Sequence, residues 1–239
     1  MKLLMTSGGF RNAAIVKAAV ELVGKRKRKI NFAVIAEAVK GEPGDHRWFI
    51  EDLERLADHF GGKIELVDLQ AQNLDEVQKR LEIADVIYCE GGNTDYLMEV
   101  FKKTGFNKVL PKLLEDKVWV GTSAGSCVVA HKESEEFQQE VYREQRTVDK
   151  FLNLVPIEFL PHMNGEFYVL NRENAIAESR RTKLPVYALT DAAAIVVKTD
   201  AGGNLSYQMV GRGYTVAHNC AVLQDSKPAK FSVSVELRG

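Results

Sequence analysis

The sequence predicts an α/β fold, with a doubly wound and mostly parallel sheet, helices on both of its faces, and antiparallel strands near the C-terminus. Short apolar runs alternate with segments of helical periodicity up to residue 123, which is typical of βαβ units in a parallel sheet. Beyond residue 183, strand-like runs are separated by Gly-rich turns, as in antiparallel hairpins. The 239 residues contain no linker-like tract, so we expect one domain over residues 1–239.

In the first half of the chain, each expected strand is a short apolar run, and each expected helix has apolar residues at helical spacing. The expected strands cover residues 2–6, 30–35, 64–69, 85–89 and 118–120. The expected helices cover residues 13–23, 48–60, 74–81, 96–101, 110–114 and 124–130. Asn73 precedes the third of these helices, and Glu76 occupies its third position, which is a capping pattern that marks a helix start.

The second half of the chain is less regular. Residues 131–150 are polar and rich in Glu, so we expect a solvated helix there, with a mobile lid as the alternative. Apolar residues 157–160 predict a strand that leads into Pro161 and His162, and a polar helix is expected near residues 175–183. The later strands are expected at residues 186–189, 192–198 and 231–235.

The composition is that of a soluble globular protein. Hydrophobic residues make up 45% of the chain, charged residues 27%, and the formal net charge is -1, which gives no electrostatic reason for a nucleic-acid or anionic-membrane partner. The basic run at residues 25–29 is expected to be the solvated end of the preceding helix. No apolar run is long enough for a membrane span or a signal segment, so we expect a cytoplasmic protein.

The three cysteines are widely spaced, at Cys89, Cys127 and Cys220. An odd number of cysteines in apolar surroundings fits a reducing compartment and predicts neither a disulfide framework nor a zinc site. We therefore expect no metal and no cofactor.

The chain is organised around Gly121-Thr122-Ser123-Ala124-Gly125. This Gly-x-Ser-x-Gly pattern follows an apolar strand and precedes a run of small residues suited to a helix, which is the context of a nucleophile elbow. The two glycines let the strand and the helix approach closely, and the strained turn exposes the Ser123 hydroxyl at a helix N-terminus. We predict that Ser123 is a nucleophile.

A serine nucleophile needs a base, and an acid that orients this base. His162 is the best candidate base, because it directly follows an apolar run and Pro161. The candidate acid is Asp191, which lies where a strand ends and the chain turns back; Glu158 and Glu166 are the alternatives. The other four histidines are His46, His59, His131 and His218.

Backbone N–H groups near the nucleophile would stabilise a tetrahedral oxyanion. The amide of Ala124 is the natural first donor, since it follows the nucleophile directly. Gly91 and Gly92 offer the second donor, because a glycine can bring its N–H close to a substrate carbonyl. Both glycines follow an expected strand, as Ser123 does, so we expect all these groups at one edge of the sheet.

In combination, four short blocks resemble the S51 peptidase family, which includes aspartyl dipeptidase (peptidase E) and cyanophycinase. The blocks are Gly91-Gly92-Asn93-Thr94, Gly121-Thr122-Ser123-Ala124-Gly125, Pro161-His162 and Leu189-Thr190-Asp191. The resemblance implies a doubly wound fold related to class I glutamine amidotransferase-like domains. It also implies that Ser123 is the nucleophile, His162 the base, and Gly92 with Ala124 the oxyanion donors, and Asp191 falls where family members carry the third triad residue.

The order and identity of these residues argue against an α/β-hydrolase fold and differ from the catalytic residues of the glutamine amidotransferases. The chain order is Ser, His, acid, whereas α/β-hydrolases have Ser, acid, His. Glutamine amidotransferase-like domains have a Cys nucleophile and an acid two residues after the His, and this position is Asn164 here.

The candidate substrate-binding residues are Asn93 and Arg172. The resemblance suggests Arg172 as holder of a substrate carboxylate, which implies N-terminal Asp as the preferred residue. Two departures argue against a strict preference: the spacing after His162 is shorter than in aspartyl dipeptidase, and residues 133–139 replace that enzyme's Asp-containing loop. We therefore predict a metal-independent serine peptidase that cleaves short peptides, in the manner of a dipeptidase, through an acyl-enzyme.

Two alternatives come from other classes. The first is a catalytically idle binding or regulatory protein on the same fold, and the second is a thiol enzyme that uses Cys127 or Cys89. As partner we expect a small peptide substrate, with no nucleic acid and no membrane, and the protein is expected to be a monomer or a small homo-oligomer.

Overall fold

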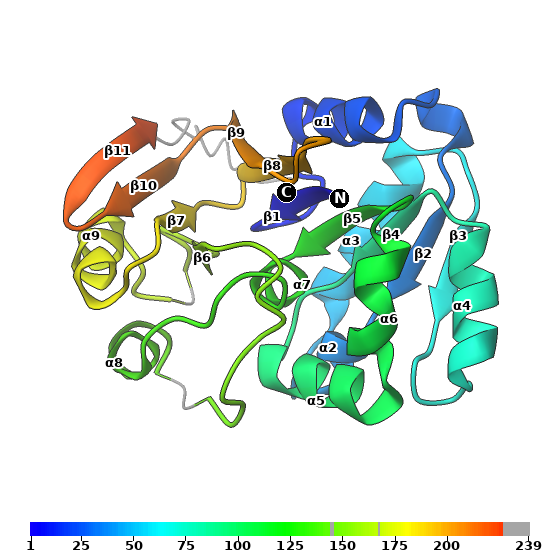
Figure 1. Ribbon diagram of the computed structural model, residues 1–239, viewed down its shortest axis with the longest axis horizontal. Coiled ribbons are helices and arrows are strands. Elements are labelled where there is room, and N and C mark those ends of the chain that lie inside the picture. Colours follow the sequence, from blue (N-terminus) through cyan, green and yellow to red (C-terminus); the bar gives the residue numbers. More distant parts are fainter. Residues whose placement is uncertain (144–145, 167, 227–239) are drawn as a thin grey trace, which may run out of the picture.

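The computed structural model describes residues 1–143, 146–166 and 168–226. In this part of the chain the strands form two sheets, and the larger has seven strands in the order β3-β2-β4-β5-β1-β8-β9 (Figure 1). Its strands are β1 (Lys2–Thr6), β2 (Phe32–Ile35), β3 (Ile64–Val67), β4 (Val86–Cys89), β5 (Val118–Thr122), β8 (Ala193–Thr199) and β9 (Leu205–Gly211). The pairings among β1 to β5 are parallel, and β8 and β9 add antiparallel pairs. The prediction of a large, mostly parallel sheet followed by antiparallel strands is confirmed.

The second sheet has four strands in the order β11-β10-β7-β6. They are β6 (Glu158–Leu160), β7 (Val186–Leu189), β10 (Tyr214–His218) and β11 (Ala221–Ser226). The sequence did not predict this separation into two sheets, because a strand's apolar pattern does not reveal which strand it pairs with. The expected strand at residues 231–235 lies outside the described residues.

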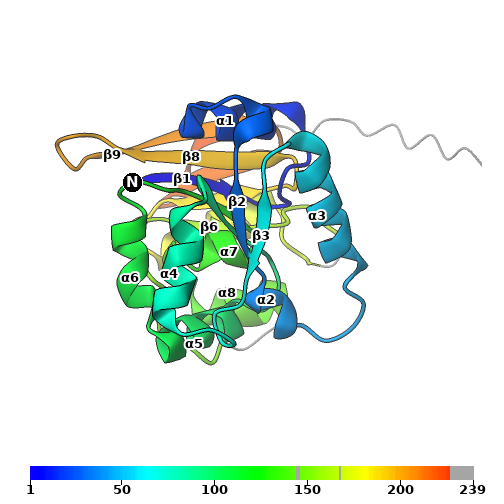
Figure 2. The same ribbon diagram turned by 90° about the vertical axis from the view of Figure 1, so that its right-hand side faces the viewer.

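Helices cover both faces of the larger sheet, as predicted (Figure 2). Successive side chains of β1 point to opposite faces of the sheet. Leu4 packs with the apolar residues of α1 and α3, whereas Leu3 and Met5 pack with those of α4, α5 and α6. The helices are α1 (Ala13–Val23), α2 (Glu37–Lys40), α3 (Arg47–His59), α4 (Leu74–Glu82), α5 (Thr94–Thr104), α6 (Phe106–Leu113), α7 (Ala124–Cys127), α8 (Glu135–Phe137) and α9 (Arg172–Arg181). In the described ranges, no helix is long and apolar enough to cross a membrane.

The polar segment at residues 131–150 differs from the expected solvated helix. The structure has the short helix α8 followed by a π-helical turn at Gln138–Tyr142. Phe137 and Val141 are buried and pack against residues of β6, β7 and α9. A few apolar residues at the right spacing are enough to dock this segment, although its composition is polar.

Two local predictions also need correction, and one short helix was not predicted. α1 ends at Val23, where Gly24 has the left-handed φ of 73°, so the basic run at residues 25–29 follows the helix and does not form its last turn. The elbow helix α7 ends at Cys127, earlier than the expected residue 130. The short helix α2 was not predicted.

Candidate active site

Ser123 lies at the carboxyl end of β5, at the first turn of α7. Its φ of 48° and ψ of -111° are strained for a non-glycine residue. Gly125 permits this turn because a Cβ there would lie 2.1 Å from the carbonyl oxygen of Cys89. The strand, sharp turn and helix therefore place the Ser123 side chain at the edge of the larger sheet.

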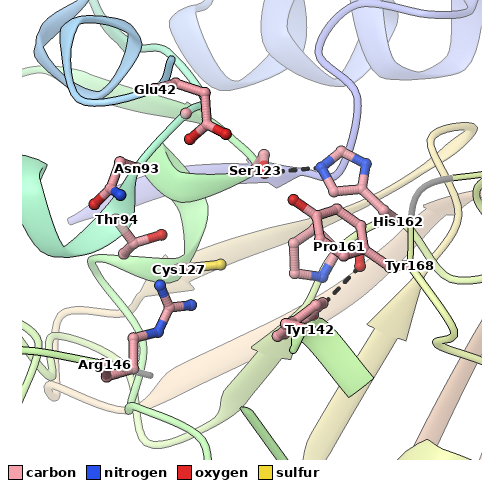
Figure 3. A pocket seen from close by; sticks show the side chains of 11 residues that line it. Glu42, Asn93, Thr94, Ser123, Cys127, Tyr142, Arg146, Pro161, His162 and Tyr168 are labelled. Carbon is pink, nitrogen blue, oxygen red and sulfur yellow. Dashed lines mark hydrogen bonds between the residues drawn. The ribbon is translucent and has the colours of Figure 1, made fainter. Parts of the chain in front are cut away.

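His162 and Asp191 come from the second sheet and meet Ser123 at this edge. His162 follows β6, and its Nε2 lies 2.8 Å from Ser123 Oγ (Figure 3). Its Nδ1 lies 2.8 Å from Asp191 Oδ1, at the turn after β7. A carboxylate only accepts hydrogen bonds when ionised, so Nδ1 carries the proton and Nε2 accepts from the Ser123 hydroxyl. The three residues thus form a continuous hydrogen-bonded chain.

Asp191 is held by more than the histidine. Ser7, in the loop after β1, donates its hydroxyl proton to Asp191 Oδ1 at 2.7 Å and accepts the His162 backbone N–H at 2.8 Å. Burial by itself would raise the pKa of Asp191, but the hydrogen bond and charge of His162, with Ser7 and Arg11, outweigh it and lower this pKa to about 2. Asp191 is therefore ionised throughout the neutral range.

Gly92 lines the same pocket as Ser123, and Ala124 follows Ser123 directly in the chain. Gly92 has a φ of 122°, and a Cβ there would lie 2.4 Å from the carbonyl oxygen of Ala38. Among the described residues, neither the N–H of Gly92 nor that of Ala124 has an acceptor. Gly91 lies against the nucleophile as well, because its Cβ position would be 3.2 Å from Ser123 Cβ.

A small pocket opens beside Ser123 (Figure 3). It is lined by Glu42, Gly92, Asn93, Thr94, Ser123, Cys127, Tyr142, Arg146, Pro161, His162 and Tyr168. Sequence reasoning missed Glu42, Tyr142, Arg146 and Tyr168 as site residues. Glu42 lies in the turn after α2, Tyr142 ends the π-helical turn, and Arg146 and Tyr168 lie in irregular segments, so no local pattern marks them.

The missed aromatic residues form the wall on the histidine side of the pocket. The Tyr168 ring stacks on the His162 ring, with 5.7 Å between centroids, and meets Tyr142 edge-on at 5.0 Å. These contacts shield one face of the imidazole and restrict its rotation.

Arg146 is the pocket's guanidinium, and two carboxylates hold it. Its Nη2 lies 2.9 Å from Glu133 Oε1, its Nη1 lies 3.6 Å from Asp95 Oδ1, and its guanidinium sits over the Phe151 ring. Burial would lower the pKa of Arg146, but Glu133 outweighs it and raises this pKa. The side chain is therefore cationic and firmly positioned.

The structure does not bring Arg172 into this pocket. Arg172 begins α9, and its Nε donates to Asp225 Oδ2 at 2.9 Å on the surface. Asn93 does line the pocket, where its side-chain oxygen caps α5 by accepting from the Tyr96 N–H at 2.8 Å.

The alternative acids and thiols lie elsewhere. Glu158 is buried in β6 and Glu166 is exposed, and the carboxylate that contacts the His162 ring is that of Asp191. Cys89 is fully buried, and Cys127 lines the pocket one helical turn after Ser123. Within the described ranges, no group of three or more His, Cys, Asp or Glu side chains is arranged to hold a metal ion.

The chain is similar to known proteins in both sequence and structure. Residues 3–203 match the model of a family described as Peptidase family S51. The uncharacterized peptidase Lmo0363 of Listeria monocytogenes is 26% identical over 156 residues, which cover 63% of this chain and 75% of that protein. The uncharacterized peptidase PM1590 of Pasteurella multocida is 25% identical over 207 residues, 84% of this chain and 95% of that protein.

Two solved structures share the fold. One is described as a putative peptidase E protein from Listeria monocytogenes, with a TM-score of 0.65 and 22% identity over 87% of this chain and 97% of that chain. The other is described as a peptidase from an acI-B1 Actinobacterium, with a TM-score of 0.67 and 16% identity over 95% of both chains.

Proposed function

The chain belongs to peptidase family S51, and from this premise we propose that it is a serine peptidase that hydrolyses short peptides in the manner of a dipeptidase. The observation that carries the proposal is the hydrogen-bonded chain from Ser123 through His162 to Asp191, with 2.8 Å at both contacts. A serine hydroxyl is a weak nucleophile by itself, and this arrangement supplies the base and the orienting acid that it needs.

In the proposed reaction, the Ser123 oxygen attacks the scissile carbonyl carbon while His162 Nε2 takes the hydroxyl proton. The Ala124 and Gly92 N–H groups bind the oxyanion, and each such donor is worth about 100- to 1000-fold in rate. The imidazolium, stabilised by Asp191, then gives its proton to the leaving amine, and the C–N bond breaks to leave an acyl-enzyme. Water attacks this ester with His162 again as base, which releases the acid product and restores the serine.

The proposed substrates are small because the pocket is small. Its cavity volume is about 40 Å³, which suits the end of a peptide rather than a long chain. The proposal includes N-terminal Asp as the favoured residue, but it reassigns the cation that would bind the Asp side chain. Arg146 lines the pocket and Arg172 does not, so we assign this contact to Arg146.

We also propose a relationship to the class I glutamine amidotransferase-like domains, supported by the nucleophile at a strand-turn-helix junction of a parallel sheet. The thiol alternative has little support, because the group within hydrogen-bonding distance of His162 Nε2 is the Ser123 hydroxyl.

Cleavage of a dipeptide panel by the wild type and by Ser123→Ala tests the proposal. The panel contains Asp-Xaa and other dipeptides, and fluorophosphonate labelling reports on the nucleophile independently of the substrate. We expect labelling and cleavage in the wild type. Ser123→Ala should lose both, because alanine has no hydroxyl oxygen to attack the probe or the peptide.

Ser206→Ala serves as the control, since Ser206 lies on β9 and is exposed. Cleavage that persists in Ser123→Ala would show the mechanism to be wrong. A wild type that is neither labelled nor active would favour the catalytically idle binding protein.

A further inference from the structure

We propose that Glu42 binds the α-ammonium group of the substrate's N-terminal residue. This inference rests on the proposed peptidase function and specifies which part of a peptide the site recognises. Four features of the structure support it: the position of Glu42, the way the fold holds it, the charge balance of the pocket, and the direction of the reaction.

Glu42 comes from the turn after α2 and lines the pocket together with Gly92, Asn93 and Ser123. In Figure 3 its carboxylate points into the space beside Ser123, on the side opposite His162. A carboxylate placed next to a nucleophile that already has its own base has no evident role in proton transfer. Its position suits binding of a positively charged group.

The fold anchors the backbone of Glu42 on both sides. Its N–H donates to the Val39 carbonyl at 3.2 Å, and its carbonyl accepts from His46 Nε2 at 2.8 Å. The preceding Gly41 packs so tightly on α5 that a Cβ would lie 2.6 Å from Tyr96 Cβ. Among the described residues, the Glu42 carboxylate itself has no hydrogen-bond or ion-pair partner. The backbone of Glu42 is therefore held in place, and its carboxylate is available to a ligand.

Of the charged side chains that line the pocket, that of Glu42 has no counter-charge within the described part of the chain. Arg146 has carboxylate partners of its own in Glu133, at 2.9 Å, and Asp95, whereas the described residues provide no cation for Glu42. A charge on one pocket wall without a counter-charge raises the local concentration of ligands of opposite sign. The substrate group that matches is an ammonium.

The direction of the reaction places the substrate's N-terminal residue on the Glu42 side. His162 gives its proton to the leaving amine, so the leaving part of the peptide lies toward His162 and its neighbour Tyr168. The acyl part lies on the opposite side, where Glu42 is (Figure 3). The α-nitrogen of an N-terminal residue is about 2.5 Å from the attacked carbon, two bonds away, so its binding partner has to lie next to Ser123.

Pairs of substrates that differ only in the ammonium group test the inference. Succinyl-Leu is Asp-Leu without its α-amino group, and propionyl-Leu is Ala-Leu without its α-amino group. kcat/KM is measured for both pairs with the wild type, Glu42→Gln and the control Glu54→Gln, which carries the same change at an exposed position of α3. Fluorophosphonate labelling of Ser123 is followed in all three proteins.

We expect the wild type to prefer the amino substrates, and Glu42→Gln to lose about 10- to 100-fold of kcat/KM on them, the range for a hydrogen bond to a charged group. The same variant should keep its rate on succinyl-Leu and propionyl-Leu and its rate of labelling, and Glu54→Gln should resemble the wild type.

Two results would overturn the assignment of Glu42 while leaving the peptidase function intact. These are equal losses on amino and des-amino substrates, and a Glu42→Gln variant with the wild-type preference. If the wild type cleaves none of the four compounds and is not labelled at Ser123, the proposed function fails and the assignment of Glu42 fails with it.

Discussion

At the scale of single residues, the proposed chemistry depends on which imidazole nitrogen carries the proton. Asp191 accepts from Nδ1 at 2.8 Å, so Nε2 is left as the base toward Ser123. The low pKa of Asp191, about 2, keeps this acceptor ionised and therefore able to stabilise the imidazolium. An aspartate at a turn is also an ordinary structural residue, and the two roles have different consequences.

Asp191→Asn separates these two roles. The amide can present its N–H₂ group to Nδ1 and favour the wrong tautomer, so we expect kcat for dipeptide cleavage to fall by about 10⁴-fold, with KM changed little. Steady-state kinetics on the best dipeptide of the panel measures this. Asp58→Asn, at an exposed position of α3, is the matched control. A loss of thermal stability with kcat retained would make Asp191 a turn former only.

At the scale of elements, the short strand β6 supports the base and also carries an unusual buried acid. Glu158 is 4% exposed. Burial raises its pKa to about 8, against the effect of a Thr182 hydrogen bond and with a further contribution from Glu178 and Glu133. Glu178 in turn accepts two hydrogen bonds from Ser134, both at 2.7 Å. These carboxylates connect β6 and α9 to the segment that ends at Arg146.

The raised pKa of Glu158 predicts a loss of stability with rising pH. Its pKa is about 4.3 in an unfolded chain and about 8 in the folded one, so between these values the folded state holds the extra proton. The free energy of unfolding should therefore fall as pH rises from about 4.5 to 8, by up to about 1 kcal/mol per pH unit. Urea unfolding across this range measures the effect.

Glu158→Gln should remove this part of the pH dependence, because a glutamine does not titrate. Glu136→Gln, at an exposed position of α8, should retain it. Identical pH slopes in the wild type and Glu158→Gln would contradict the prediction.

At the scale of the whole molecule, the site lies where the two sheets meet. The larger sheet supplies Ser123 after β5 and the proposed oxyanion donor Gly92 after β4, and the second sheet supplies His162 after β6 and Asp191 after β7. Ser7, after β1, bonds to both residues of the second sheet. The alignment of Ser123, His162 and Asp191 therefore depends on the contacts that Ser7 makes between the two sheets.

Ser7→Ala tests the importance of this contact between the two sheets. It leaves the buried N–H of His162 without its acceptor and removes one donor from Asp191, so we expect kcat to fall about 10-fold and the free energy of unfolding to fall by about 1–3 kcal/mol. KM should change little, because Ser7 does not line the pocket. Kinetics and urea unfolding, with Ser206→Ala for comparison, provide the readouts, and an unchanged kcat would mean that each sheet holds its residues independently.

Much of the fold and the central triad could be predicted from local patterns. Apolar runs, helical spacing and caps such as Asn73 depend on neighbours in the chain, so the parallel core and its helices followed from the sequence. Ser123 and His162 were recognisable because each follows a strand directly, and strands of one α/β sheet end at a common edge. Asp191 was a weaker prediction, since turn residues are often Asp for structural reasons.

The remaining features depend on contacts between distant parts of the chain. The separation of β6, β7, β10 and β11 into a second sheet is set by strand pairing, which single-strand patterns do not encode. Arg146 replaced Arg172 in the pocket because Glu133, Asp95 and Phe151 hold it there, and these partners are up to about fifty residues away in sequence. Glu42 follows the short helix α2, and the packing of Gly41 on Tyr96 helps to place it in the pocket with Ser123. The sequence thus determined the candidate nucleophile and the type of sheet that carries it, whereas tertiary packing decided which charged groups surround it.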